Sequence, residues 1–380
     1  MIYYFTSSYS TFLGDSSERN LIVSQAACNR INEIANVLSE KNKVTIVNIS
    51  ITKAVKNFEE SIQELSKDFK VYFPPIKCGG LQNIYMILES IKFVKKNLMA
   101  GDIIMFYNAH YLMLPIICSF AHSKSVKIVY QIEELYSTCD YYHSLKKLLL
   151  QWVERCMSKV CSAYMAVSES LGNIYLAKKP GIISYGYIDN ATNFLCTEKK
   201  EPGIFNIVYA GRLDVDGGIE VLLDLIPQIE QECKLIITGT GPLAENVLEY
   251  HNINPRVNIE YRGFVSDTEL DTILREADVC LSMLRSDKEF SQKSFPSKVI
   301  KYLSYGSLVI SSDVPALNEL KEVCSNLLIY KNGEELVQMI EKAYVISREM
   351  NKAEQRKSFN DFYNMKRKEL AYFFDRASEW

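Results

Sequence analysis

The sequence predicts an α/β fold with two doubly wound domains, each built on a parallel sheet. Two observations lead to this prediction. Short apolar runs alternate with helical patterns in both halves of the 380 residues, which is typical of parallel strands covered by helices on both faces. A polar stretch at residues 197–203 separates the two halves. We therefore expect domains over residues 1–198 and 199–355, followed by a C-terminal helix over 356–380 that packs back on the first domain.

In the first half, continuous apolar runs predict strands, and apolar residues at helical spacing predict helices. The expected strands are Met1–Thr6, Lys43–Ile49, Val71–Phe73, Asp102–Tyr107, Ser125–Gln131 and Tyr164–Val167. The expected helices are 26–38, Leu81–Asn97 and His143–Lys159.

The second half repeats this alternation. The expected strands are Phe205–Ala210, Cys233–Thr238, Val257–Tyr261, Val279–Met283 and Leu308–Ser311. Helices are expected to start at about Gly218 and at about Pro242. Further helices are expected over Ser266–Ala277, over Ser294–Tyr305 and from Gly333 onward. Pro227 should end or kink the first of these helices. Ser266 and Glu269 form a capping box for the third.

The composition excludes several classes of protein. Hydrophobic residues make up 48% and charged residues 23% of the chain, which excludes disordered, collagen-like and small disulfide-stapled proteins. The ten cysteines form no C-x-x-C pair, so buried free thiols are expected rather than a metal site. The net charge of −3 gives no indication of nucleic-acid binding. The N-terminus does not look like a signal peptide, and the apolar runs are too short to span a membrane, so we expect a cytoplasmic protein.

Three glycine-bearing segments in the second half lie at the ends of strands, where parallel sheets bind ligands. The first segment follows the strand Phe205–Ala210. Gly211 would let a phosphate approach the backbone, and Arg212 would offer forked donors to the phosphate oxygens. A turn glycine beside a surface arginine is the alternative.

The second segment resembles a dinucleotide fingerprint. The pattern G-x-G-x-x-A is matched by Gly239, Thr240, Gly241, Pro242 and the two residues that follow. Glu260 lies at a plausible ribose-binding distance along the chain. An NAD-dependent enzyme is therefore one alternative. The fingerprint normally occupies the first strand-to-helix turn of its domain, whereas here a strand and a helix precede it. Pro242 is expected just inside the start of the helix.

The third segment starts a helix. Ser294 can cap this helix, Pro296 suits its first turn and Gly306 can end it. Free backbone N–H groups and the positive dipole at such a helix start suit a diphosphate. Lys298 and Lys301 are three residues apart and would share a helical face. An ordinary amphipathic helix is the alternative.

Taken in order and spacing, these segments resemble the C-terminal domain of GT-B-fold glycosyltransferases, especially family 4, the group 1 transferases. The resemblance runs from Ile207 to Leu320. It rests on the segments Val208–Leu213, Ile236–Pro242, Tyr261–Val265, Ala277–Leu281 and Phe295–Ile310. In the first half, Ala163–Ser168 and Ser184–Asp189 look like the last two strands of the family's N-terminal domain.

The resemblance implies two Rossmann-like domains that face a cleft, with a nucleotide-sugar on the second domain and the acceptor on the first. It implies retention of anomeric configuration and no metal, because positive charge and backbone donors stabilise the departing nucleoside diphosphate. Arg212 would contact the diphosphate, and Gly239–Pro242 would line the nucleotide pocket. Phe264 and Val265 would lie near the base. The helix start near Ser297 would face the phosphates or the sugar.

The chain departs from the family pattern at two positions. The family usually has a lysine where this chain has Gly217, and a ribose-holding glutamate where it has Lys301. A companion glutamate of the family aligns with Lys293, or with Glu289 if the loop shifts. Our hypothesis is that Lys298 or Lys301 supplies the missing positive charge.

In the first domain, four residues resemble acceptor-side positions of the family. Gly14 lies in the loop after the first strand, although the family often has a glycine pair there. His110 follows the strand Asp102–Tyr107, where the family often has an acceptor-contacting histidine; an ordinary loop histidine is the alternative. Glu133 and Glu134 follow the next strand, and either carboxylate could accept a proton from the acceptor hydroxyl. Sequence alone does not rank the two, and a helix-start carboxylate is the alternative.

We therefore expect a hexosyltransferase-type enzyme that moves a sugar from a UDP- or GDP-sugar to a carbohydrate or lipid-linked saccharide. The expected setting is the synthesis of a cell-surface polysaccharide such as capsule or lipopolysaccharide, without a cofactor, a metal or nucleic acid. The alternative from another class is a non-catalytic GT-B-like partner or regulatory protein with a decayed donor site. Lysines beside leucines in His143–Lys159 suit peripheral contact with the inner membrane face, with a solvated helix face as the alternative.

Overall fold

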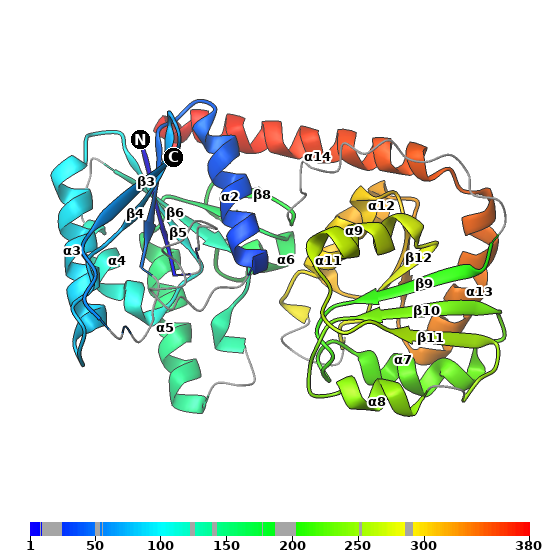
Figure 1. Cartoon of the computed structure of the whole chain (residues 1–380). Coiled ribbons are helices and arrows are strands. Elements are labelled where there is room, and N and C mark those ends of the chain that lie inside the picture. Colours follow the sequence, from blue (N-terminus) through cyan, green and yellow to red (C-terminus); the bar gives the residue numbers. More distant parts are fainter. Residues whose placement is uncertain are drawn as a thin grey trace. The chain divides into compact units, whose positions relative to one another are not determined.

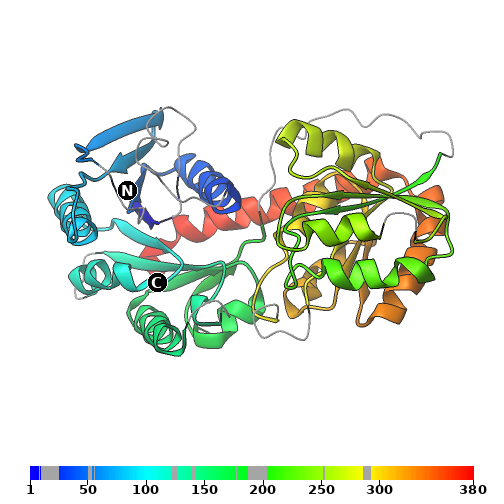
Figure 2. The same cartoon turned by 60° about the horizontal axis from the view of Figure 1, so that its bottom comes forward.

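The computed structural model describes residues 1–7, 9, 25–49, 54, 56–121, 126–138, 143–176, 178–186, 203–250, 253–285 and 292–380. The chain divides into two compact units. The first comprises Met1–Tyr187 together with Met365–Trp380, and the second comprises Ile188–Asn364. The domain boundary expected after residue 198 lies outside the described residues. Within each unit, helices cover both faces of a sheet (Figures 1 and 2).

The first unit is built on a sheet with the strand order β3-β4-β2-β1-β5-β6-β7-β8. Its strands are β1 (Ile2–Thr6), β2 (Val44–Asn48), β3 (Ser61–Ser66), β4 (Phe69–Phe73), β5 (Ile103–Tyr107), β6 (Lys127–Ile132), β7 (Ala163–Ala166) and β8 (Gly181–Ile183). Among the strands that the structure describes in this unit, β3 alone is antiparallel to its neighbour, β4. The strand order reverses between β1 and β5, and ligands of doubly wound sheets bind at such a reversal.

Helices of the first unit are α2 (Gln25–Ser39), α3 (Gln82–Asn97), α4 (Leu114–Phe120), α5 (Ser144–Val160) and α6 (Glu169–Leu176). The prediction of a strand over Ser184–Asp189 is wrong, because the strand lies earlier in the chain. The chain is already extended and paired with β7 at Gly181, and β8 ends at Ile183, so Ser184 to Gly186 follow the strand.

The second unit has a fully parallel sheet with the order β11-β10-β9-β12-β13-β14. Its strands are β9 (Phe205–Ala210), β10 (Cys233–Thr238), β11 (Val257–Tyr261), β12 (Val279–Ser282), β13 (Leu308–Ser312) and β14 (Leu327–Tyr330). In sequence order this is 3-2-1-4-5-6, the Rossmann arrangement, in which the order reverses between the first and fourth strands. That point lies between β9 and β12 in this unit.

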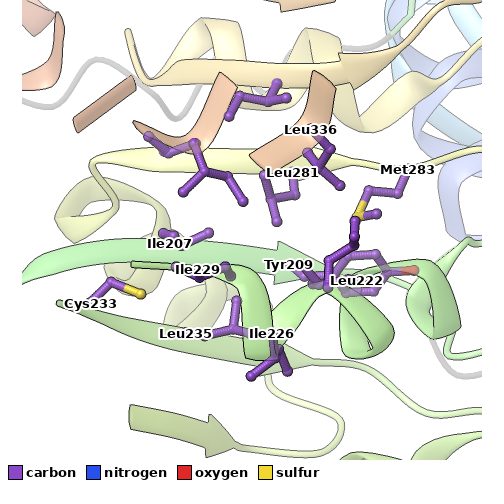
Figure 3. Packing of buried hydrophobic residues seen from close by; sticks show 14 of the residues in the cluster. Ile207, Tyr209, Leu222, Ile226, Ile229, Cys233, Leu235, Leu281, Met283 and Leu336 are labelled. Atoms are coloured by element: carbon purple, nitrogen blue, oxygen red, sulfur yellow. The ribbon is translucent and has the colours of Figure 1, made fainter. Parts of the chain in front are cut away.

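A continuous apolar core holds the sheet of the second unit to its helices. Ile207 and Tyr209 of β9 and Leu281 of β12 are fully buried against Leu222 and Leu336 from the helices on one face (Figure 3). Burying side chains of this size contributes about 1.5–3 kcal/mol each. The core therefore fixes the position of β9, at whose end one loop of the candidate site begins.

Helices of the second unit are α7 (Ile219–Leu225), α8 (Ala244–Glu249), α9 (Asp267–Glu276), α11 (Ser297–Ser304), α12 (Asn318–Val323) and α13 (Gly333–Glu349). As predicted, α7 ends before Pro227, and the Ser266 side chain caps α9 by accepting from the Glu269 N–H. Two details of the prediction are wrong. Pro242 precedes the start of α8 at Ala244, and α11 starts at Ser297 after Pro296, so Ser294 is not its cap.

The last helix, α14 (Lys352–Asp375), belongs to both units, because the boundary between them falls at Met365. Leu370 and Phe374 near its end are buried in the core of the first unit. Among the described residues, none of the helices combines the length and the apolar character that crossing a membrane would require.

Candidate functional site

Two glycine loops pack against each other at the ends of β9 and β10. The Gly211 N–H donates to the carbonyl of Thr238, and the Leu213 N–H donates to the carbonyl of Thr240. Gly239 has φ +123°, and a Cβ there would lie 1.8 Å from the Gly211 oxygen. Only glycine fits at position 239. The two loops therefore present one continuous stretch of backbone at the end of the sheet.

Lys298 reaches this backbone from the first turn of α11. A Cβ at Gly211 would occupy the space of the Lys298 ammonium. The same ammonium lies 4.6 Å from the centroid of the Tyr209 ring. Burial lowers the pKa of Lys298 to about 8, and Asp214 opposes that shift. Within the described part of the chain, the ammonium makes neither a hydrogen bond nor an ion pair.

Arg212 stands on the exposed side of the same loop. Its Nε pairs with Asp214 Oδ2 at 2.7 Å, and its side chain is 76% exposed. Asp214 also accepts from the Gly217 N–H at 2.8 Å. Asp214 thus orients the arginine and closes the loop, while the Nη nitrogens of Arg212 make no bond to other described residues. Arg212 and Lys298 place two cations beside Gly211.

The structure gives a physical reason for the glycine at position 217. The Tyr209 hydroxyl lies 3.0 Å from the carbonyl oxygens of both Arg212 and Gly217. A Cβ at position 217 would lie 2.6 Å from the Arg212 oxygen and 2.8 Å from the Tyr209 hydroxyl. A lysine cannot occupy this position without moving the loop. The Lys298 ammonium instead lies over the ring of the tyrosine that fills the space.

The other expected donor-side residues are scattered around this centre. Lys301 turns away from it, because its ammonium pairs with Asp271 of α9 at 3.4 Å. Phe264 is 83% exposed in the loop after β11, and Val265 follows it. Ser297 is exposed at the first residue of α11. Gly14 and Glu289 lie outside the described residues.

Glu260 does not suit the role of a ribose ligand. Its carboxylate pairs with Lys234 and with Arg262, and the hydrogen bond from Lys234 is the main cause that lowers its pKa. The glycine fingerprint also follows β10, the second strand of the unit, rather than β9. These two observations count against the NAD-dependent alternative.

In the first unit, the loops after β5 and β6 are joined by Asn108. This residue has φ +53°, a conformation that asparagine tolerates better than most residues. Its Oδ1 accepts from the N–H groups of Glu133 at 2.8 Å and Glu134 at 3.3 Å. Its Nδ2 donates to the Tyr136 hydroxyl. Asn108 therefore fixes the backbone from which both candidate carboxylates project.

His110 is held as a neutral imidazole beside this loop. Burial, together with the nearby Lys146 ammonium, lowers the pKa of His110 to about 4. Its Nδ1 accepts from the Leu112 N–H at 3.4 Å, so the proton is assigned to Nε2. A neutral histidine of this tautomer can donate a hydrogen bond to a hydroxyl oxygen.

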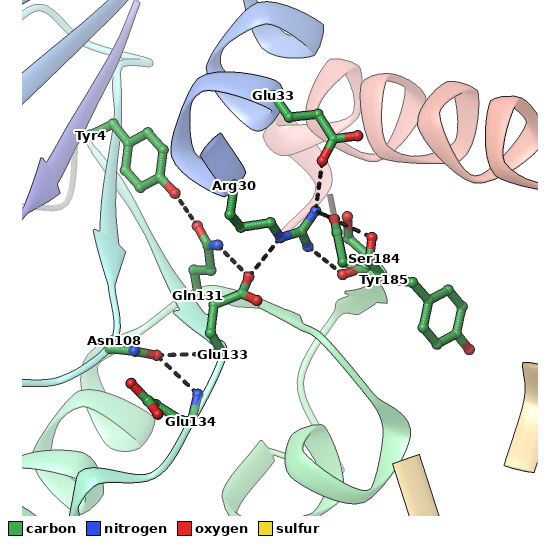
Figure 4. A network of polar contacts seen from close by, with 10 residues as sticks. Tyr4, Arg30, Glu33, Asn108, Gln131, Glu133, Glu134, Ser184 and Tyr185 are labelled. Atoms are coloured by element: carbon green, nitrogen blue, oxygen red, sulfur yellow. Dashed lines mark hydrogen bonds and ion pairs between the residues drawn. The ribbon is translucent and has the colours of Figure 1, made fainter. Parts of the chain in front are cut away.

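The two adjacent glutamates differ in their surroundings. Glu133 Oε1 accepts from Arg30 Nε at 3.0 Å and from Gln131 Nε2 at 2.5 Å (Figure 4). The Glu134 carboxylate makes no hydrogen bond to any other described residue, and burial together with the Glu133 charge raises its pKa. Glu134 is thus the better proton acceptor of the pair. Sequence reasoning missed Arg30, whose only signal is its i,i+3 spacing from Glu33.

Residues 204–344 match the family described as "Glycosyl transferases group 1". The matched residues lie within the second unit. Over 347 residues the chain is 21% identical to a phosphatidylinositol N-acetylglucosaminyltransferase subunit from Arabidopsis thaliana, and the match covers 87% of this chain and 74% of that protein. The resemblance predicted from the sequence motifs is therefore confirmed.

The whole chain has the GT-B fold, as predicted. It resembles sucrose-phosphate synthase from Thermosynechococcus elongatus with a TM-score of 0.64 and 13% identity, over 98% of this chain and 94% of that one. It also resembles the catalytic domain of starch synthase IV from Arabidopsis thaliana, bound to ADP and acarbose, with a TM-score of 0.63 and 10% identity. That match covers 100% of this chain and 99% of the other. A third similar structure is HepE from Anabaena, in complex with UDP and glucose, with a TM-score of 0.61 and 13% identity. That match covers 100% of this chain and 98% of the other.

Proposed function

We propose that this group 1 domain binds a nucleotide-sugar and that the chain transfers the sugar to a saccharide acceptor. The observation that carries the proposal is the Lys298 ammonium, which lies beside the backbone of Gly211 on a half-buried side chain and has no bonded counter-ion among the described residues. A desolvated cation of this kind gains more from a diphosphate than a hydrated surface lysine does. Arg212 adds a second cation, whose forked Nη donors make no bond to another residue that the structure describes.

These groups suit the chemistry of the leaving group. Transfer breaks the bond between the sugar and the nucleoside diphosphate, and negative charge develops on the departing phosphate oxygen. Fixed cations aimed at that oxygen stabilise the transition state without a metal. The structures with bound UDP and ADP support a nucleoside diphosphate as the leaving group. We propose a UDP- or GDP-sugar as the donor and, on the strength of the resemblance, retention of configuration. For retention, the C1–O bond to the diphosphate breaks first, the acceptor oxygen then bonds to C1 on the face that the diphosphate leaves, and the hydroxyl proton passes to a carboxylate of the chain.

On the acceptor side, we assign proton acceptance to Glu134. Its raised pKa and its lack of a hydrogen-bonding partner among the described residues favour this role over Glu133. His110 would orient the acceptor hydroxyl by donating from Nε2. These two residues follow adjacent parallel strands, β6 and β5, whose ends meet at one edge of the sheet.

The decisive experiment is a nucleotide titration. Calorimetry with UDP, GDP and ADP should find a dissociation constant for at least one nucleotide, and binding should raise the melting temperature. Lys298→Met should weaken this binding about ten- to hundredfold, the loss expected for one charge-assisted contact of about 1.5–3 kcal/mol. Lys301→Met is the matched control on the same helix and should leave binding unchanged. Wild-type protein that binds none of the nucleotides would refute the proposal.

A second candidate is a nucleotide-binding partner protein without transferase activity. It is favoured by Lys301, which stands where the resemblance expects a ribose-holding glutamate and is paired with Asp271. The two candidate functions are separated by measuring the release of nucleoside diphosphate from a bound nucleotide-sugar. Release of nucleoside diphosphate, with or without an added saccharide, supports the enzyme, whereas tight binding without release supports the partner protein.

We propose an anionic membrane surface as the setting, with α5 as the contact. Four exposed apolar residues lie at spacings that place them on one face of α5. They are Leu145 (83% exposed), Leu148 (62%), Leu149 (43%) and Trp152 (51%). Basic residues continue that face toward the helix end, and the one acidic residue of α5, Glu154, is buried and bonded to Ser137. An apolar and basic face of this kind binds anionic lipid.

Vesicle sedimentation tests this contact. The wild-type chain should sediment with vesicles that contain phosphatidylglycerol and much less with pure phosphatidylcholine, and salt should weaken the binding. Leu148→Glu should abolish sedimentation. Leu248→Glu is the matched control, because Leu248 of α8 is equally exposed at 62%. Equal sedimentation of the two variants would contradict the assignment to α5.

A further inference from the structure

A buried arginine joins three distant parts of the first unit. Arg30 of α2 is 4% exposed. Its Nε donates to Glu133 after β6, and its Nη1 lies 3.2 Å from Glu33 Oε2. Nη1 and Nη2 also donate to the carbonyls of Gly186 and Ser184, which follow β8 (Figure 4). The guanidinium therefore fixes the strand end that carries the candidate proton acceptor and the last described residues before the linker.

The contacts of Arg30 keep the two adjacent glutamates in different roles. Glu133 turns toward α2, where Arg30 and Gln131 occupy its Oε1, and the Tyr4 hydroxyl donates to Gln131 in turn. The Glu134 carboxylate makes no such bond to another described residue, and burial together with the Glu133 charge raises its pKa. A buried charge is tolerated only where it is paired and hydrogen-bonded. Without the guanidinium, the Glu133 carboxylate would lose the ion pair that holds it toward α2.

We propose that Arg30 is a positioning residue, which binds the Glu133 carboxylate so that Glu134 alone is available to take the proton of the acceptor. The inference rests on the proposed function for the identity of the reaction. The position of the two carboxylates, however, is a property of the chain that can be measured without any substrate.

The first measurement is carboxyl labelling of the full chain. A carbodiimide and glycine ethyl ester modify accessible protonated carboxyl groups, and peptide mass spectrometry distinguishes Glu133 from Glu134. In the wild type we expect several-fold more labelling at Glu134. Arg30→Lys keeps the charge but cannot reach all the acceptors, so the labelling of the two glutamates should become similar. Glu33→Gln is the control, because it leaves the Nε contact to Glu133 in place and should preserve the preference.

A second variant covers the case in which Arg30→Lys does not fold. Burial and the Glu133 charge both raise the pKa of Glu134. Glu133→Gln removes the second cause, so the acidic limb of the pH–rate profile should move to lower pH. The Tyr107 phenol interacts electrostatically with both carboxylates, and burial raises its pKa well above its usual value, so it stays neutral in this range. A purely structural role for Glu133 would lower the rate without moving the limb.

The outcomes separate this inference from the proposed function. Equal labelling of the two glutamates in the wild type, or an unchanged preference in Arg30→Lys, overturns the role of Arg30. A shifted preference in Arg30→Lys, with nucleotide affinity kept and the acceptor kcat at least tenfold lower, supports both statements. A shifted preference in Arg30→Lys, together with a wild type that binds no nucleotide, supports the positioning by Arg30 and refutes the proposed reaction.

Discussion

Lys298 and Lys301 lie on the same helix, one turn apart, yet their ammonium groups have different neighbours. The spacing of the two residues in sequence predicts a shared face, and both were candidates for the missing phosphate cation. The structure pairs Lys301 with Asp271 and leaves Lys298 beside Gly211. The sequence could not rank the lysines, because the acidic partner of Lys301 comes from a different helix.

The pKa of about 8 at Lys298 gives nucleotide binding a pH dependence. Burial lowers this pKa, and a bound diphosphate would raise it, because the anion favours the charged form. Binding is therefore coupled to proton uptake once the pH exceeds about 8. We expect the affinity for UDP or GDP to fall as the pH rises from about 7 to about 9.5, and calorimetry in buffers of different ionisation enthalpy should show the proton uptake. In Lys298→Met this part of the pH dependence should disappear.

Gly217 offers a test of the crowded loop. Gly217→Ala places a methyl group 2.6 Å from the Arg212 oxygen and 2.8 Å from the Tyr209 hydroxyl, so it should lower the free energy of unfolding by about 1–3 kcal/mol, as overpacking does. Gly80→Ala is the control, since a Cβ there has no neighbour within 4 Å. Urea unfolding of both variants gives the comparison. Equal stability of the two variants would show that the loop relaxes freely.

Some residue-level features cannot be read from the sequence. Glu133 and Glu134 have identical side chains at adjacent positions, and their difference comes from Arg30, which lies 103 residues before Glu133 in the chain. The one local pattern at Arg30, its i,i+3 spacing from Glu33, does not point to Glu133. The motif residues Gly211, Arg212 and Gly239 were recognisable, because a strand ending in glycine is itself a local signal; their roles stay predictions.

At the level of elements, most apolar strands were predictable, but the polar strand β3 and the apolar strand β14 were missed. Apart from Ser184–Asp189, the predicted strands of the parallel sheets are present with ends shifted by a few residues, because buried parallel strands are continuous apolar runs. The missed strand β3 lies at the edge of its sheet, pairs only with β4 and is mostly exposed. Its sequence, SIQELS, has no apolar run that would distinguish it from a loop.

The cap of α9 can be tested directly. Ser266 accepts the Glu269 N–H at 3.2 Å, so Ser266→Ala should lower the free energy of unfolding by about 1 kcal/mol. Glu269→Gln is the comparison, because its exposed ion pair with Arg262, at 3.6 Å, should contribute less than about 0.5 kcal/mol. Denaturant midpoints of the two variants should therefore differ, and identical midpoints would contradict the capping role.

At the level of the whole molecule, the alternation of strands and helices was enough to predict two parallel sheets, and the motif order was enough to predict the GT-B fold. What the sequence did not show is how the end of the chain is divided. The boundary within α14 falls at Met365, in the middle of a helix without a proline or glycine. Tertiary packing of Leu370 and Phe374, not local sequence, sets that boundary.

This packing predicts that the end of α14 stabilises the first unit. Phe374 is 3% exposed in its core, so Phe374→Ala should cost about 3–5 kcal/mol. Tyr372→Ala is the control on the same helix, because Tyr372 is 59% exposed. Hydrogen exchange should show the loss of protection in β1, β2 and α2, which share the core with Phe374. Protection lost evenly in both units would contradict the assignment.

The division of α14 also bears on synthesis by the ribosome. The first unit begins with Met1, but it is completed only by Met365–Trp380. The residues of the second unit, Ile188–Asn364, are translated in between, which takes on the order of 10 seconds at typical elongation rates. During that interval the nascent first sheet lacks Leu370 and Phe374, so the domain that is started first is finished last.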